Sequence, residues 1–330
     1  MASIMTNASA LTALQSLAST NKSLEMTQAR ISTGYRVATA SDNAAYWSIA
    51  TTMRSDKSSL SVVQDALGLG AGKVDTAYSA LEKTIDIVNQ IKDKLVAATG
   101  ASSTDKSKLQ TEIAGLQSQL KMSADGATFS GSNWLSLDTT TGTATPGVAD
   151  LAKVVAAFTR SASGSIQLQT IDIDIQSVKL YEAFAGATAV QDGILDGTRA
   201  GSTGVRTVGT TVAAAGTFVA TDGYAVATLT VVGFNDAQIS QMLTVVDTAA
   251  KELTDAATVL GAAKKRIDLQ KSATSILMDS IDRGVGQLVD ADMNKESTRL
   301  QALQVQQQLG IQALSIANSN AQSILQLFKG

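Results

Sequence analysis

Residues 300–328 read LQALQVQQQLGIQALSIANSNAQSILQLF, and this stretch contains no charged side chain. Steps of three and four residues separate the members of one stripe, which predicts a long helix with a single packing face. The stripe consists of Leu300, Leu303, Gln307, Gly310, Leu314, Ala317, Ala321, Ile324 and Phe328. The other faces carry mostly amides and hydroxyls, which can be buried where they find hydrogen-bond partners. A solvent-facing helix usually keeps a charged side, so the sequence predicts a helix that is surrounded by protein.

The other end of the chain has the same character. Residues 1–21 contain no ionisable side chain. An apolar stripe of helical spacing runs through Ile4, Leu11, Leu14, Leu17, Leu24 and Ile31. Two uncharged amphipathic ends predict helices that form a coiled coil with each other and then associate with copies of themselves. Periodicity alone leaves an alternative open, namely two ordinary packing helices.

Composition excludes several classes of function. The 330 residues include no Cys and no His, which removes disulfides, thiolate and imidazole catalysis and most transition-metal sites. We therefore expect neither an enzyme nor a cofactor. A net charge of −3 provides no basic stripe for nucleic acid. No window reaches the roughly 18 apolar residues of a membrane span, and no signal-peptide pattern precedes Lys22, so neither membrane insertion nor a cleaved signal is expected.

Turn and capping signals divide the chain into segments. Gly34 predicts the end of the first helix, and Ser41 or Asp42 is the predicted cap of a second helix that extends to about residue 98. Three glycines interrupt this second helix, at Gly68, Gly70 and Gly72. Glycine is unfavourable inside a helix, so these positions predict a kink or a very close neighbour.

The middle of the chain changes from helical spacing to alternation. A shorter helix is predicted from a cap at Thr104 or Asp105 to about residue 124. Alternating apolar residues in 154–178 predict a β-hairpin with one solvent-facing side and a turn at Ser163-Gly164. The Gly-, Thr-, Ala- and Val-rich segment 181–233 predicts short strands and turns, and helical spacing returns at 236–289. The predicted fold is mainly α with a β-rich insertion: terminal coiled-coil helices, a rod of long helices with a β-hairpin, and a small outer domain.

Motif-like stretches are interpreted as structural. The segment Leu67–Lys73 is rich in glycine but lacks the first Gly and the final Ser or Thr of a phosphate-binding loop. The segment Asp290–Glu296 starts like a calcium loop but lacks its central Gly, which favours a helix start or a hinge. The two tryptophans, Trp47 and Trp134, are predicted to be core or subunit contacts.

The two terminal regions resemble those of bacterial flagellins. The likeness rests on residues 31–50, ISTGYRVATASDNAAYWSIA, on residues 289–328, which begin VDADMNKESTRLQALQ, and on the hairpin sequence TIDIDI at 170–175. It covers about residues 1–135 and 240–330, two distant blocks that follow each other in the same order as the terminal regions of the family. The run NAAYWSIA at 43–50 is similar to that of alphaproteobacterial members, including rhizobial ones.

The resemblance implies a structural subunit that polymerises into the helical, extracellular flagellar filament used for swimming. In that family the terminal segments are unfolded in the monomer, pass through a type III export channel and fold under a cap at the filament tip. The implied partners are copies of the chain, sister flagellins, an export chaperone, the filament cap and hook-junction proteins. A hook–filament junction protein and a secreted adhesin are the alternatives.

The resemblance also assigns segments and residues. It implies inner-tube helices at 1–42 and 288–330 (domain D0), a rod at 43–180 and 236–287 (domain D1) and a variable outer domain at 181–235 (domain D2). The predicted polymerisation residues of the inner tube are Leu11, Leu14, Leu17, Leu24, Ile31, Leu300, Leu303, Leu314, Ile324 and Phe328. Immune-receptor positions of the family are degenerate in this chain, at Gln90, Lys92, Asp93 and Lys94 and at Ser41, Asp42 and Asn43. Weak recognition by those receptors is therefore expected.

Overall fold

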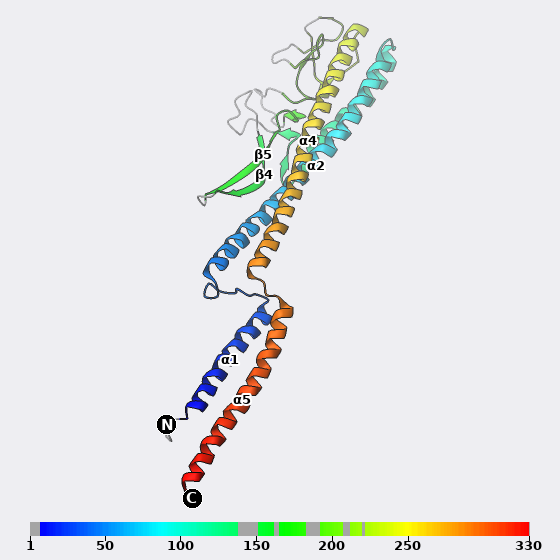
Figure 1. Ribbon diagram of the computed structural model, residues 1–330. Coiled ribbons are helices and arrows are strands. Elements are labelled where there is room, and N and C mark those ends of the chain that lie inside the picture. The colour runs from blue at the N-terminus through cyan, green and yellow to red at the C-terminus, as the bar shows by residue number, and fades with distance from the viewer. Residues whose placement is uncertain are drawn as a thin grey trace. The chain divides into compact units, whose positions relative to one another are not determined.

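A computed structural model describes residues 7–137, 151–161, 165–182, 192–206, 212–219 and 222–329, with side chains described as far as residue 319 (Figure 1). Their contacts divide the chain into two compact units. The terminal unit comprises Met1–Ser59 and Ile276–Gly330, and the central unit comprises Leu60–Ser275. Within the described ranges, no helix has the length and apolar character needed to cross a membrane.

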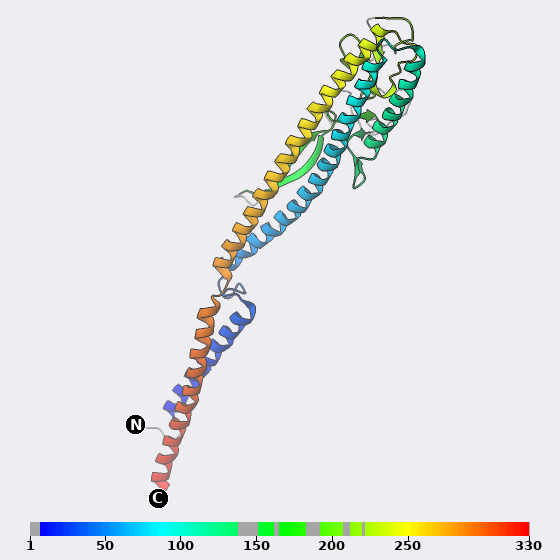
Figure 2. The same cartoon turned by 90° about the vertical axis from the view of Figure 1, so that its right-hand side faces the viewer.

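The terminal unit is built on two helices, α1 (Ala8–Thr33) and α5 (Met293–Lys329), which lie side by side (Figures 1 and 2). The side chain of Asn7 accepts a hydrogen bond from a backbone amide of the first turn and caps α1. The helix ends at the predicted Gly34, whose φ of +75° is left-handed and suits glycine. Asp292 accepts hydrogen bonds from two amides of α5 over 3.0 and 3.2 Å, which confirms the predicted helix start.

Two short segments pair with each other where the helices of the terminal unit meet. The amides of Arg36 and Val37 donate to the carbonyl of Val289 over 2.6 and 3.2 Å. The guanidinium of Arg36 donates to the carbonyl of Leu288 over 2.9 Å and so satisfies an unpaired group near the end of a helix. Beside this pairing lies a small apolar core of Val37, Ala50, Val285 and Val289.

The helix α2 (Ala44–Ala98) begins one or two residues later than predicted. The predicted caps were Ser41 or Asp42, but the side chain of Asn43 accepts the hydrogen bond from the amide of Tyr46, over 3.1 Å. Asp42 instead accepts hydrogen bonds from two amides of the preceding loop, and that from Thr39 contributes most to holding the pKa of Asp42 below its ordinary value. Asp42 therefore orders the loop, and Asn43 starts the helix.

The next helix, α3 (Ser103–Asp125), begins earlier than predicted. Its cap is Ser102, whose hydroxyl accepts a hydrogen bond from the amide of Asp105 over 3.2 Å, and not Thr104 or Asp105. All three residue types favour helix caps, so the sequence did not distinguish them. Trp134 follows this helix and is buried in the central core, as predicted.

Ion pairs join α2 to α4 (Asp236–Val289) in one antiparallel register. In the central unit Asp75 pairs with Lys264 and Lys92 pairs with Asp247, each over 2.6 Å. The two pairs are separated by the same number of residues along both helices, so they specify one register. The signs are opposite in the two pairs, so a slide that brought one pair level with the other would oppose like charges.

Acid is expected to remove the contribution of one of these pairs. Hydrogen bonds from Lys251 and then Lys92 lower the pKa of Asp247 from 3.8 to about 2. Because the folded pKa is the lower one, the stabilisation is present above about pH 4 and is lost as the pH falls toward 2. The pair is exposed, so Asp247→Asn should cost about 1 kcal/mol or less at pH 6 and only a small part of that near pH 2. Thermal unfolding of both proteins between these values tests this, and a pH-independent difference would contradict it.

The described strands form four two-stranded sheets. The largest is the antiparallel hairpin of β4 (Leu151–Arg160) and β5 (Ile166–Asp174), shown in green in Figure 1. The small pairs are β1 (Thr128–Phe129) with β2 (Ser132–Asn133), β3 (Ser136–Leu137) with β6 (Tyr181–Glu182), and β7 (Arg199–Ala200) with β8 (Gly223–Tyr224). The mainly helical fold with a β-rich insertion is therefore confirmed.

The hairpin keeps the predicted alternation over only part of its length. Ile171 and Ile173 of β5 are buried, but Ile166 and Leu168 are exposed, because they lie an odd number of residues away and point to the opposite face. A register shift interrupts the pairing in β4, between Val155 and Ala157. The predicted turn at residues 163–164 lies outside the described residues.

Glutamine side chains of α3 and α4 bind backbone carbonyls in the described pieces of the 181–233 segment. Gln238 donates from its amide to the carbonyls of Ala214 and Thr217 over 3.0 and 2.9 Å. Gln117 of α3 donates to the carbonyls of Val226 and Leu229, at either end of the 3-10 helix η1 (Val226–Thr228), over 2.9 and 3.0 Å. These amides satisfy backbone groups that lack strand partners.

The close neighbours predicted for the glycines of α2 exist at two of the three positions. A Cβ atom on Gly70 would overlap the side chain of Val154 in β4, and one on Gly72 would lie 2.6 Å from the ring of Phe129 in β1. Gly68 has no atom within 4 Å of the corresponding position. Glycine at 70 and 72 therefore lets strand residues reach the helix backbone.

Alanine substitutions at these glycines are expected to have opposite effects. Gly68→Ala should raise the free energy of unfolding by up to about 1 kcal/mol, because alanine favours the helix and meets no obstacle. Gly70→Ala and Gly72→Ala should lower it by about 1–3 kcal/mol, because Val154 and Phe129 must move. Chemical denaturation of the three variants measures these values, with Gly68→Ala as the matched control. Equal changes at all three positions would disprove this interpretation.

Candidate functional site

The predicted stripe of α5 is the face that packs on α1. Leu303 is buried, and Leu300, Gln307, Gly310 and Leu314 are partly buried, whereas their neighbours on the other faces of the helix are exposed. Gly310 permits the closest approach, because a Cβ there would lie 2.9 Å from Cδ1 of Leu17 in α1. The spacing of three and four thus identified the contact between the two helices.

Polar contacts add to this apolar contact at three levels. The amide of Asn7 donates to the carbonyl of Ala317 over 2.9 Å, and the amide of Gln307 donates to Oδ1 of Asn21 over 2.8 Å. Near the junction with the rest of the terminal unit, Arg30 pairs with the buried Glu296 over 3.4 Å. These contacts are distributed along the whole length of the helix pair, but few side chains of either helix are fully buried.

Large apolar side chains remain on the outside of both helices. On α1, Leu11 and Leu14 are 61% and 55% exposed. On α5, Val305, Leu309 and Ile316 are 54–60% exposed, and at 3.6 residues per turn they fall within about 40° of one another. We call these five residues the outer apolar face. Large apolar side chains left exposed at helical spacing, in the number seen on these two helices, mark an interaction site.

The ten residues predicted for polymerisation divide into three groups. Leu17, Leu24, Ile31, Leu300, Leu303 and Leu314 are partly or fully buried between the helices. Leu11 and Leu14 are exposed and belong to the outer apolar face. The side chains of Ile324 and Phe328 lie outside the described residues, although α5 extends past both.

The prediction missed Val305, Leu309 and Ile316. Their spacing of four and seven residues is itself helical, and it defines a second apolar stripe on α5. Amides and hydroxyls outnumber these apolar residues on the outer faces of α5, so the second stripe is less conspicuous in the sequence than the first. A helix with two apolar stripes and no charge between them has two packing faces, of which one is used within the subunit.

The receptor-related positions have ordinary structural roles. Lys92 and Lys94 form ion pairs with Asp247 and Glu112, each over 2.6 Å, while Gln90 and Asp93 are exposed on α2. Ser41, Asp42 and Asn43 form the loop and cap before α2. The expectation of weak receptor recognition stays a prediction.

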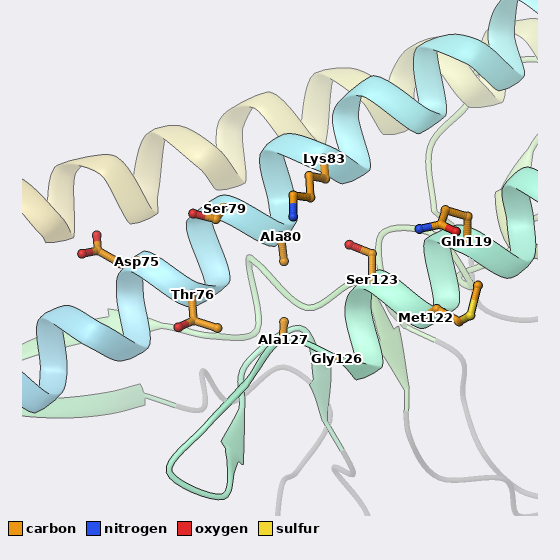
Figure 3. A pocket seen from close by; sticks show the side chains of 10 residues that line it. All are labelled: Asp75, Thr76, Ser79, Ala80, Lys83, Gln119, Met122, Ser123, Gly126 and Ala127. Carbon is orange, nitrogen blue, oxygen red and sulfur yellow. The ribbon is translucent and has the colours of Figure 1, made fainter.

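An open groove in the central unit lies between α2 and α3 (Figure 3). Its lining residues are Asp75, Thr76, Ser79, Ala80, Lys83, Gln119, Met122, Ser123, Gly126 and Ala127. Asp75 is engaged by Lys264, so Lys83 is the one lining charge without a partner among the described residues. A single lysine among hydroxyls and amides supplies neither an acid–base pair nor an activated nucleophile. We assign no reaction to this groove.

Comparison with known proteins identifies relatives along the whole chain. The family model of the bacterial flagellin N-terminal helical region matches residues 4–140, and that of the C-terminal helical region matches residues 243–328. The chain is 49% identical to Flagellin C of Rhizobium meliloti (strain 1021) and 50% identical to a flagellin of Brucella melitensis biotype 1, over the full length of each. It is 41% identical to Flagellin A of Rhizobium meliloti, again over both complete sequences.

Proposed function

The chain belongs to the bacterial flagellin family and is a structural subunit of the flagellar filament, and from this we propose that its paired terminal helices form the inner tube. The single observation that supports this arrangement is the outer apolar face. It is uncharged and it is exposed in the isolated subunit. Subunits that polymerise provide the apolar partner that this face lacks.

The same reasoning supports different positions in the filament for different segments of the chain. We propose inner-tube segments at 1–42 and 288–330, a rod at 43–180 and 236–287, and a solvent-facing outer domain at 181–235. The charge pattern supports this division, because the ion pairs between long helices lie on α2 and α4 whereas most of α1 and α5 is neutral. Charged residues suit the rod, which contacts water, and neutral residues suit a tube enclosed by other subunits.

Export and assembly partners follow from the family. We propose that the subunit leaves the cell without a cleaved signal and that it contacts an export chaperone, the filament cap and hook-junction proteins. The α1–α5 pair buries few side chains, so it gains little stability by itself. We propose that the pair becomes stable only when neighbouring copies cover it, which leaves the chain able to unfold for export.

The function is proposed to be purely structural. The groove of Figure 3 offers no catalytic constellation, and the sequence contains neither Cys nor His. No observation favours an adhesin or a hook–filament junction protein over the filament subunit.

Seeded growth tests the proposed function. Purified subunits are added to short filament fragments and followed by electron microscopy. Long helical filaments are expected at micromolar concentrations. Protein that stays monomeric beside competent seeds would instead favour the junction-protein alternative.

A further inference from the structure

A lysine and a glutamate form an ion pair inside the central unit, around the start of β6. Nζ of Lys179 lies 2.9 Å from Oε2 of Glu182, and the two side chains are 1% and 2% exposed. The segment between them is paired on both sides, because the amide of Leu180 donates to the carbonyl of Leu135 and the amide of Leu195 donates to the carbonyl of Leu180. All three leucines are completely buried. The ion pair is therefore shielded from solvent.

Burial makes this pair different from the two ion pairs that join α2 to α4, whose side chains are 39–47% exposed. Removal of two charges from water is costly, and their mutual attraction often does not repay that cost. An amide bond between the same two side chains would carry no charge. The site therefore contains an amine and a carboxyl group that are in contact and whose charges are unfavourable where they lie.

A second buried carboxylate lies next to the pair. Asp196 is 6% exposed, and it accepts hydrogen bonds from the backbone amides of Glu182 and Gly193 over 2.6 and 2.8 Å. Burial raises the pKa of Asp196 above its ordinary value, against the opposing effects of these two amides and of the charge of Lys179. A carboxylate with a raised pKa is a better proton acceptor. The site thus holds two carboxylates for one ammonium, and one of them is available to take a proton.

We propose that the side chains of Lys179 and Glu182 become joined by an isopeptide bond, formed without an enzyme once the central unit has folded. Asp196 takes one proton from the ammonium of Lys179, and the neutral amine attacks Cδ of Glu182. A C–N bond forms and one C–O bond of the carboxyl group breaks. The released oxygen leaves as water with two of the three ammonium protons, one of them returned by Asp196, and the third proton stays on the amide nitrogen.

The folded structure favours this step in two ways. Nζ of Lys179 is 2.9 Å from an oxygen that is bonded directly to the carbon under attack. Reacting groups that are well oriented at such distances behave as if they were present at about 10⁵ M or more. Exclusion of water also disfavours hydrolysis of the bond once it has formed. Both conditions require the folded central unit, so an unfolded chain does not react.

Mass spectrometry of the folded full-length subunit, kept until its mass no longer changes, tests the proposal. The intact mass is expected to be lower than that of the sequence by one water molecule. Trypsin cleaves after Arg160, Lys179 and Arg199 in an unmodified chain, so the cross-linked chain should instead give residues 161–199 as one peptide that is one water lighter. The full sequence mass would overturn the proposal. Loss of water at an Asp-Gly step, through a succinimide, would leave cleavage after Lys179 intact and would overturn it as well.

Two variants separate the reaction from the ion pair. Asp196→Asn keeps both partners of the ion pair but removes the proton acceptor, so its cross-linked fraction should rise on the order of a hundredfold more slowly than that of the wild type. The double variant Lys179→Met with Glu182→Gln fills similar space without charge, so it should fold and keep the mass of its sequence. Cross-linking of Asp196→Asn at the wild-type rate would overturn the proposed route. These measurements do not depend on filament growth, so the inference does not rest on the proposed function.

Discussion

Replacement of Leu309 by glutamate is expected to stop filament growth at concentrations where the wild type assembles. Leu309 lies at the middle of the outer apolar face of α5 and is 57% exposed in the subunit. If neighbouring copies cover this face, each subunit must bury a carboxylate without a partner, at a cost of about 3 kcal/mol or more. That free energy corresponds to a rise of roughly a hundredfold or more in the critical concentration. Seeded growth followed by light scattering measures it.

Two controls separate assembly from folding. Ser297→Glu places the same charge on an exposed position of the same helix, but beside Lys295, Glu296 and Arg299, where charges already occur. This variant should assemble within a few-fold of the wild-type concentration. Leu309→Met keeps the apolar character and should also assemble. Normal growth of Leu309→Glu would show that the outer apolar face stays in contact with water.

Removal of Glu252 is expected to give the largest loss of stability in the central unit. Its two carboxylate oxygens each accept a hydrogen bond over 2.8 Å from the guanidinium of Arg199, a side chain that is 0% exposed. Burial alone would raise the pKa of Glu252, but the hydrogen bond and charge of Arg199, with the charge of Arg206, hold this pKa below its ordinary value. Glu252→Ala leaves the buried guanidinium without its counter-charge, which typically costs about 3–5 kcal/mol.

The adjacent residue provides the control for Glu252. Lys251 pairs with Asp247, but its side chain is 74% exposed, so Lys251→Ala should cost about 0.5 kcal/mol or less. Denaturant unfolding of both variants gives the comparison. The two carbonyls that Arg199 also contacts, those of Ile194 and Gly204, limit the loss but carry no full charge. Similar stabilities for the two variants would mean that Arg199 is satisfied without Glu252.

The sequence predicted the parts of this fold that depend on local spacing. Leu303 and Gly310 follow the three-and-four pattern, and they face α1 as expected. Gly34 ends a helix because the chain there adopts a left-handed backbone conformation, which glycine accepts without strain. These features need no knowledge of distant parts of the chain.

Features that depend on distant partners were missed or were only half predicted. One miss was local: Asn43 and Asp42 are both good helix caps, and hydrogen bonds from the amides of the loop three and four residues earlier engage Asp42 and leave Asn43 as the cap. Gly70 needs glycine because of Val154, which is far along the chain. The pairing of Arg199 with Glu252 likewise crosses from a β-strand to a helix. The spacing of Leu309 places it on a second apolar stripe of α5, but which of the two stripes faces solvent in the subunit is decided by the position of α1.

Chemical labelling of one cysteine tests the central claim most directly. The chain contains no cysteine, so Leu309→Cys introduces a single thiol on the outer apolar face. Its reaction rate with a maleimide is measured in free subunits and in filaments, with Ser297→Cys treated in the same way. We predict that the thiol introduced by Leu309→Cys reacts rapidly in the free subunit and on the order of a hundredfold more slowly in the filament. That factor corresponds to a free energy of about 3 kcal/mol for exposing the site in the filament. Equal rates in the two states would contradict the claim that neighbouring copies cover this face.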